Sequence, residues 1–163
     1  MITLRVATRD DVPLILSLIR ELAEYERDPK AVVATEEMLR RNLFGEGYGR
    51  GATAECVIGE VDGEPQGFAL FFHNFSTWMG RPGLYLEDLF VRPAARRHGL
   101  GRALLRHLAR IALERGCARM EWAVLDWNEP AMAFYRSLGA TPMDEWTTWR
   151  LTGKALEDLA SGD

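Results

Sequence analysis

The sequence predicts a mixed α/β (α+β) fold, in which helices cover a mixed sheet. Helical and strand-like patterns alternate along its 163 residues. The composition, 47% hydrophobic and 27% charged, is that of a globular chain long enough to bury a core. No repeat, low-complexity tract or linker divides the chain, so we expect a single domain over residues 1–163.

The first third of the chain predicts one strand followed by two helices. The strand is expected where apolar and polar residues alternate, and the first helix shows apolar residues at helical spacing. Thr8 with Asp11 resembles a capping box, and Pro13 suits a first helical turn. The expected elements are a strand over 2–6, helices over 12–23 and 35–43, and a glycine-rich loop over 45–51.

The remainder predicts a hairpin, further strands and three helices. Asp62-Gly63 is a hairpin signal, and Gly139 is a typical helix stop. The expected strands cover 54–61, 67–75, 84–91, 120–125 and 147–151, and the expected helices cover 99–116, 128–138 and 154–160.

Within the strand over 84–91 the apolar side chains change face. Leu84 and Leu86 occupy even positions, whereas Leu89 and Val91 occupy odd ones. Glu87-Asp88 lies where the parity changes. One inserted residue would produce this pattern, so the sequence predicts a β-bulge at this point.

The segment Arg96-Arg97-His98-Gly99-Leu100-Gly101 lies between a predicted strand and a predicted helix. Glycines there remove side chains from the turn, so the amides of residues 99–103 can face outward together. An open helix N-terminus of this kind binds phosphate. The same residues also suit an ordinary glycine-containing turn beside solvated arginines.

The net charge and the residue composition argue against several classes of protein. The net charge of -4 disfavours a nucleic-acid binder, although six arginines gather in one stretch and suggest a small polyanion as ligand. No apolar run reaches membrane-helix length, and the N-terminus lacks a signal-peptide layout, so we expect a cytoplasmic protein. The two cysteines and three histidines form no metal-binding pattern. The six arginines are Arg92, Arg96, Arg97, Arg102, Arg106 and Arg110.

Arg96-x-x-Gly99-x-Gly101 after a strand resembles the acetyl-CoA pyrophosphate loop of the GNAT N-acetyltransferases. The resemblance covers nearly the whole chain and includes Asn128-Glu129-Pro130-Ala131 and Phe134-Tyr135. The chain is most similar to the diamine acetyltransferases of the spermidine/spermine and thialysine type. The shared segments are 21–23, 25–26, 85–88, 90–91, 127–130 and 149–150.

This resemblance implies a mostly antiparallel sheet with a central splayed strand pair, acetyl-CoA as co-substrate and no metal. It also implies a homodimer, which Trp78, Trp146 and Trp149 favour as surplus large aromatics. The cofactor-binding residues that it implies are Leu89, Phe90, Val91, Arg96, Arg97, His98, Gly99, Leu100, Gly101, Arg102, Asn128, Glu129, Pro130, Ala131 and Tyr135.

Acyl transfer to an amine requires two proton movements. A primary amine is only roughly 0.04% neutral at pH 7, and only the neutral form attacks. Glu87 is the expected general base, and the resemblance assigns Tyr135 as the acid that protonates the CoA thiolate. Tyr135 also lies on the apolar face of its helix, so it suits a core aromatic as well. We expect direct attack in a ternary complex.

The acceptor site is expected to be acidic. Tyr25 and Glu26 match residues that line the amine site of diamine acetyltransferases, and Glu87 adds a second negative group. The same acids also suit a solvated surface. The other substrate-binding candidates are Glu121, Trp122 and Ala123.

The identity of the acceptor stays open at this point. Polyamine enzymes of the family carry an acid shortly before the pair that matches Trp149-Arg150, and this chain has none there. That departure favours thialysine or a lysine-like amine. Other acceptors to weigh are a protein N-terminus, a protein lysine or an aminoglycoside, and a non-catalytic CoA-binding domain is a further alternative.

Overall fold

The computed structural model describes residues 1–45 and 51–162. Most of the loop expected over 45–51 therefore lies outside the described residues. The chain forms two compact units, residues 1–123 and 124–163. None of the described helices combines the length and apolar character that a membrane span requires.

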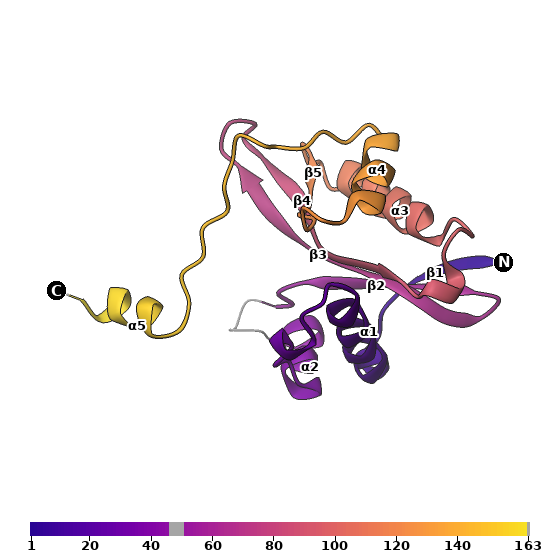
Figure 1. Ribbon diagram of the computed structural model, residues 1–163, viewed down its shortest axis with the longest axis horizontal. Coiled ribbons are helices and arrows are strands. Elements are labelled where there is room, and N and C mark those ends of the chain that lie inside the picture. The colour runs from indigo at the N-terminus through magenta and orange to yellow at the C-terminus, as the bar shows by residue number, and fades with distance from the viewer. Residues whose placement is uncertain (46–50, 163) are drawn as a thin grey trace. The chain divides into compact units, whose positions relative to one another are not determined.

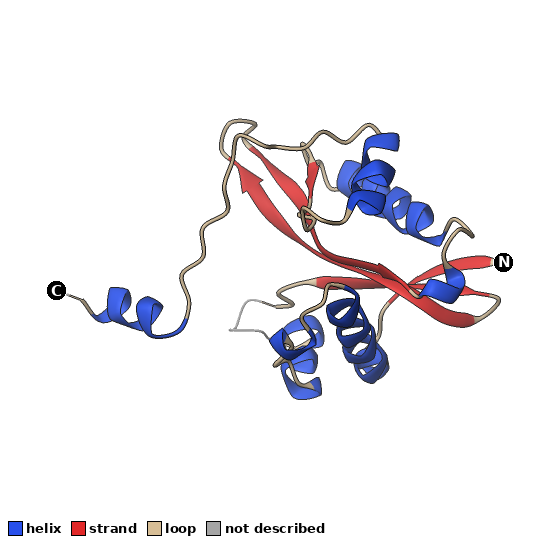
Figure 2. Cartoon of the chain, viewed as in Figure 1, coloured by secondary structure: helices blue, strands red, loops and turns tan. Residues whose placement is uncertain are grey.

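The first unit contains a five-stranded sheet with its strands in sequential order (Figure 2). Neighbouring strands are antiparallel except the last pair, which is parallel. The mixed, mostly antiparallel sheet that the sequence predicts is therefore confirmed. Its strands are β1 (Ile2–Val6), β2 (Glu55–Val61), β3 (Glu64–Ser76), β4 (Arg81–Val91) and β5 (Met120–Glu121).

The β2–β3 hairpin forms where the sequence predicts it. Val61 pairs with Glu64, which leaves Asp62 and Gly63 as a two-residue turn. Both turn residues have positive φ, 51° and 83° respectively. A tight hairpin turn of the right twist needs this conformation, and Asp-Gly adopts it at low cost.

Helices cover both faces of the sheet in the first unit, with α1 and α2 on one face and α3 on the other (Figure 1). Side-chain parity explains this arrangement, because alternate residues of a strand point to opposite faces. Cys56 and Ile58 join the core beneath α1, whereas a Cβ at Gly59 would lie 2.7 Å from Leu100 of α3. The helical segments are η1 (Arg9–Asp11), α1 (Val12–Tyr25), η2 (Pro29–Ala31), α2 (Glu36–Phe44), η4 (Pro93–Ala95) and α3 (Leu100–Glu114).

An ion-pair network ties the start of the first helical segment to the sheet. The predicted capping box between Thr8 and Asp11 is present. Arg5 donates to both carboxylate oxygens of Asp11, at 2.7 and 2.8 Å, and to Glu60 at 2.7 Å. The hydrogen bonds from Arg5 lower the pKa of Asp11 to about 2. This network joins β1, β2 and η1.

The second unit holds α4 (Glu129–Ser137) and α5 (Gly153–Ser161). Asn128 caps α4, because its Oδ1 accepts from the Ala131 N–H at 3.3 Å. Gly139 follows the helix with a φ of 87°, as a helix-stopping glycine does. Both ends of α4 are therefore where the sequence places them.

Two predicted strands differ from the structure. The strand expected over 120–125 is limited to Met120–Glu121. The strand expected over 147–151 is not formed, and every residue from 141 to 162 is exposed. A strand exists only if a neighbour accepts and donates its backbone hydrogen bonds, which residue preference for extended structure does not supply.

Candidate active site

The predicted β-bulge is present in β4. Leu70 of β3 pairs with Asp88, and the next residue, Phe71, pairs with Leu86. Glu87 is therefore the extra residue on β4 and has no counterpart on β3. The bulge lies where the sequence places the change of parity.

The bulge puts two consecutive carboxylates on the same side of the sheet. Registered partners share a face, and Asp88 pairs with Leu70 of the core beneath α1. Before the bulge the odd residues face this side, and after it the even residues do. Glu87 and Asp88 therefore both face the side that α1 covers.

The parallel pairing of β4 and β5 is short. β5 pairs with β4 only at Leu84 and Tyr85, although β4 continues to Val91. Beyond Tyr85, the strand edge that points away from β3 has no registered partner among the described residues. Its backbone groups are thus available to an extended ligand lying between the strands.

The predicted cofactor residues at the end of β4 contribute chiefly backbone. Phe90 is only 4% exposed and packs in the core. Leu89 and Val91 are half-buried and pair with β3 through Ala69 and Gly67. A cofactor at this edge would therefore meet main-chain groups rather than the Phe90 ring.

Around the bulge the structure gathers acidic groups. Burial, together with the nearby charges of Glu87 and Glu26, raises the pKa of Asp88 to about 6. Burial also raises the pKa of Glu26. The pKa of Tyr85 is raised by burial and by the charges of Glu87 and Glu121. Of the predicted site residues, Glu26 and Glu87 thus lie near Asp88, and Glu87 and Glu121 lie near Tyr85.

Asp88 was not assigned a role from the sequence. The sequence shows that Asp88 follows the parity change. Its partial burial, however, depends on α1, which packs over that face of the sheet. A half-buried aspartate beside two other carboxylates is unfavourable unless a cation joins it. The acid cluster, defined as Glu26, Glu87, Asp88 and Glu121, is therefore suited to a positively charged ligand.

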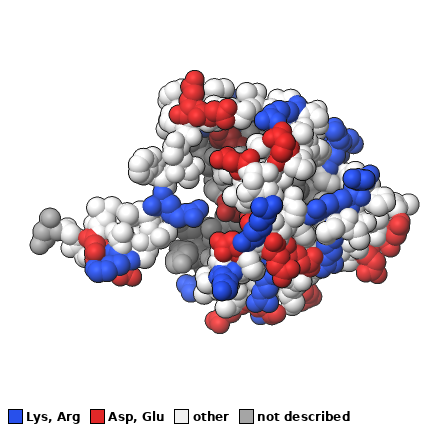
Figure 3. Space-filling model, in the orientation of Figure 1, with Lys and Arg blue, Asp and Glu red and all other residues white. Residues whose placement is uncertain are grey.

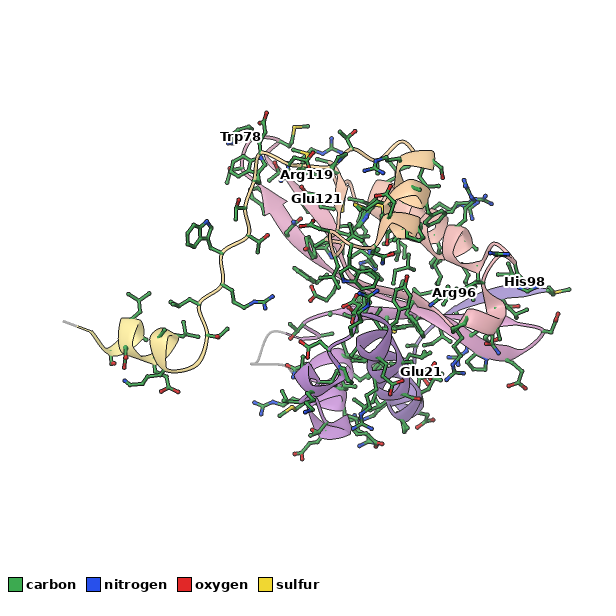
Figure 4. All side chains as sticks on the ribbon, in the orientation of Figure 1. Glu21, Trp78, Arg96, His98, Arg119 and Glu121 are labelled. Atoms are coloured by element: carbon green, nitrogen blue, oxygen red, sulfur yellow. The ribbon has the colours of Figure 1, made fainter. Side chains whose placement is uncertain are left out.

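The other acceptor-site candidates lie at β5 and at the end of α1. Glu121 forms an ion pair with Arg119 at 3.0 Å (Figure 4). Trp122 is half-buried and Ala123 is exposed just after β5. Tyr25 is half-buried in the last turn of α1.

The predicted phosphate loop leads into an open helix N-terminus. Arg97 and Gly99 have positive φ, 69° and 86°. No side chain caps the first turn of α3, so its first amides point outward without an intrahelical partner. A Cβ at Gly99 would meet nothing within 4 Å, and one at Gly101 would meet only Val91 at 3.9 Å. The loop therefore leaves space for a phosphate group against the backbone.

Side chains of the loop divide into anchored and exposed groups. Leu100 is 1% exposed and anchors α3 against Gly59, so only its amide is available. Arg97, His98 and Arg102 are exposed. These three side chains are placed to add positive or polar character around the loop.

Two arginines of the cluster are held by the protein itself. Arg92 donates to Glu21 at 2.7 and 2.9 Å and to the Pro65 carbonyl at 3.0 Å. Arg96 donates through Nε to the Val91 carbonyl at 2.9 Å. On the face shown in Figure 3, acidic side chains are interspersed with basic ones.

In the second unit, the remaining candidates lie on α4. Asn128 is 8% exposed, and Glu129 pairs with Arg136 at 3.0 Å. Pro130 and Ala131 form the first turn. Tyr135 is half-buried with its ring 5.6 Å from that of Phe134, so it is not enclosed as a core residue would be.

Among residues 1–45 and 51–162, no three His, Cys, Asp or Glu side chains gather in a way that could hold a metal ion. Cys56 and Cys117 are buried free thiols. Burial raises the pKa of Cys56 to about 12, so its thiol is inert.

Asp88→Asn should make the protein more stable above pH 6. A folded-state pKa raised from 3.8 to about 6 means that the folded protein loses stability as pH rises through this window. The asparagine side chain does not ionise, so the variant should not show this loss. In the wild type the loss amounts to up to about 3 kcal/mol of unfolding free energy at pH 8 and is absent below pH 4. Urea unfolding at pH 4, 6 and 8 measures the effect. Asp10→Asn is the control, because it changes an exposed aspartate. In this variant the unfolding free energy should fall between pH 4 and 8 as it does in the wild type. An equal loss in Asp88→Asn would contradict the assignment.

Comparison with known proteins agrees with this geometry. The model of the acetyltransferase (GNAT) family matches residues 18–140. The chain is 39% identical to the thialysine N-epsilon-acetyltransferase of Bos taurus, a match covering 98% of this chain and 97% of that protein. It is 33% identical to the L-ornithine N5-acetyltransferase NATA1 of Arabidopsis thaliana, with 96% and 86% covered. Among solved structures, an integron cassette protein from V. cholerae superposes with a TM-score of 0.80 at 27% identity, covering 99% of this chain and 98% of that one. The chain therefore belongs to the GNAT acetyltransferase family and is an N-acetyltransferase.

Proposed function

We propose that this enzyme transfers an acetyl group from acetyl-CoA to the side-chain amine of a small lysine-like acceptor such as thialysine. The observation that carries the proposal is the acid cluster around the bulge. A protonated amine entering this region meets Asp88 with Glu26 and Glu87 close enough to perturb it. Such a region favours a compact cation over a neutral ligand.

The class of acceptor is supported by two independent features. Two of the similar proteins act, by their names, on thialysine and on L-ornithine, which are amino acids with a side-chain amine. Residues 146–148, before Trp149-Arg150, contain no acid, whereas polyamine enzymes of the family carry one shortly before this pair. An extended polycation needs several separated negative groups, and a lysine-like amine needs fewer.

Acetyl-CoA is the co-substrate of GNAT acetyltransferases. In this chain we assign its pyrophosphate to the open amides of the loop before α3, with Arg97, His98 and Arg102 around it. The pantetheine arm would run along the unpaired edge of β4 at residues 89–91, and in the family that the chain resembles the residue matching Asn128 also touches this arm. Open space above Gly99 and Gly101 supports the loop assignment.

The proposed reaction is direct attack in a ternary complex. The amine gives up a proton to Glu87, directly or through water, and its nitrogen attacks the thioester carbonyl carbon. A backbone amide near Leu89 stabilises the oxyanion. The carbon–sulfur bond then breaks, and Tyr135 protonates the departing CoA thiolate. No acyl-cysteine is needed, which agrees with the inert, buried Cys56.

An acceptor panel tests this function. Free CoA release is measured with thialysine, lysine, ornithine, putrescine, spermidine, a peptide N-terminus and an aminoglycoside. The highest kcat/KM is expected with thialysine or another lysine-like amine. A preference for the peptide or the aminoglycoside would overturn the acceptor class, and CoA binding without release from any acceptor would indicate a non-catalytic domain.

Tyr135→Phe tests the assigned acid, because it keeps the ring and removes only the hydroxyl. The turnover number should fall by about 10²–10⁴. The Kd for acetyl-CoA should change little, because the lost interaction belongs to the transition state. The measurements are steady-state kinetics with the best acceptor and calorimetry with acetyl-CoA. Near wild-type turnover would remove this role from Tyr135.

We further propose a cytoplasmic homodimer whose chain is one domain. The family match over residues 18–140 crosses the boundary between the two compact units and supports the single domain. Large apolar side chains left in water support self-association: Trp78 is 87% exposed, Trp146 69% and Trp149 91%.

The dimer can be tested by light scattering at micromolar concentration. A mass of twice 18.4 kDa is expected. Trp149→Ser should shift the population toward the monomer if this aromatic is buried between copies. A wild-type protein that scatters only as the monomer would reject the proposal.

A further inference from the structure

Arg96 links the cofactor loop before α3 to the acceptor-site residues at the end of α1. It lies in the loop that leads to α3, and its guanidinium Cζ is 4.7 Å from the centre of the Tyr25 ring at the end of α1. The same Cζ is 5.8 Å from the centre of the Phe90 ring. Figure 4 labels Arg96 in this region of the first unit. One side chain of the cofactor loop therefore contacts the helix that carries the acceptor-site residues.

The guanidinium is fixed in position rather than pointing into solvent. Its Nε donates to the Val91 carbonyl at 2.9 Å, which orients the planar group at the end of β4. Phe90 beneath it is 4% exposed and belongs to the core, so this base is rigid. Arginine suits this place because its flat group can stack on rings while its edge donates hydrogen bonds.

Tyr25 is the last residue of α1, and the chain turns sharply after it. Arg27 has a φ of 67°, and the Asp28 N–H donates to the Ala23 carbonyl at 2.9 Å, which closes the helix end. Glu26, a member of the acid cluster, directly follows Tyr25. Whatever fixes the Tyr25 ring therefore also restricts where the Glu26 carboxylate can lie.

We propose that Arg96 is a positioning residue that couples the cofactor loop to the acceptor site, so that a filled loop strengthens binding of the amine. The inference rests on the proposed function. A ligand on the loop amides restricts the backbone at residues 96–99, and Arg96 passes that restriction to Tyr25 and Glu26. Coupling between two sites is reciprocal, so the amine strengthens CoA binding by the same factor.

This role differs from that of a phosphate-binding cation, which the sequence suggests for Arg96. A lysine at this position keeps the positive charge near the loop but loses the planar group that both stacks and donates to Val91. Arg96→Lys therefore separates the two roles. Arg97→Lys is the matched control, since Arg97 is an exposed neighbour in the same loop.

The first test measures the Kd of thialysine by calorimetry with and without saturating CoA, which lacks the acetyl group and so permits no turnover. In the wild type, CoA should tighten thialysine binding about 5-fold or more. In Arg96→Lys this ratio should fall to about 1, and in Arg97→Lys it should stay at the wild-type value. An unchanged ratio in Arg96→Lys, with wild-type CoA affinity, would make Arg96 a phosphate-binding cation only.

Tyr25→Leu provides a second variant. It removes the ring and should bring the ratio of thialysine Kd values without and with CoA down to about 1, as Arg96→Lys does. The double variant should show no further fall in this ratio. Additive losses would mean that the two residues act separately. Circular dichroism verifies that each variant is folded.

The second test does not depend on the acceptor. The protein contains four tyrosines, so 3-fluorotyrosine labelling gives few ¹⁹F signals, and Tyr25→Phe assigns the one from Tyr25. Adding CoA alone should shift this signal in the wild type and in Arg97→Lys, but not in Arg96→Lys. The same shift in Arg96→Lys would overturn the coupling. A failed acceptor panel would overturn the proposed function and leave this measurement decisive for Arg96.

Discussion

One residue in β4 without a partner on β3 is the constraint on which the site depends. Because Glu87 is inserted between Leu86 and Asp88 in the ladder with β3, Leu84 and Leu86 before the insertion lie on the same face of the sheet as Leu89 and Val91 after it. The same insertion turns two successive carboxylates to the face that α1 covers. It also accompanies the point beyond which β5 no longer pairs with β4. A single backbone irregularity thus brings two carboxylates to one face and lies next to an open strand edge.

The electrostatics of this region oppose the stability of the protein. Asp88 is half-buried and lies near two further carboxylates, which raises its pKa to about 6. At neutral pH the folded chain therefore carries an unfavourable charge that a core residue of similar size would avoid. Sites that break a local rule without a structural gain are commonly functional. A cationic acceptor would relieve the repulsion, so the same groups that cost stability can supply binding energy.

The arginines in and near the cofactor loop have different roles. Arg92 fastens the end of β4 to α1 through Glu21, and Arg96 lies close to the rings of Tyr25 and Phe90. Both are therefore engaged with the protein, whereas Arg97 is exposed in the loop with the open amides. Counting positive charges along the sequence overstates how many face a ligand, because a guanidinium also serves as a structural connector.

Several features of the fold follow from local chemistry and could be predicted from a few neighbouring residues. The Asp62-Gly63 turn, the Asn128 cap, the glycine stop after α4 and the parity change at Glu87-Asp88 are each set by a few neighbouring residues, so each could be predicted. Other features depend on contacts between residues that are far apart in the sequence. The burial of Asp88 depends on α1 covering one face of the sheet, and the stacking of Arg96 joins residues 71 positions apart. The extended residues 147–151 form no strand, because a strand requires a hydrogen-bonding neighbour and residue preference provides none.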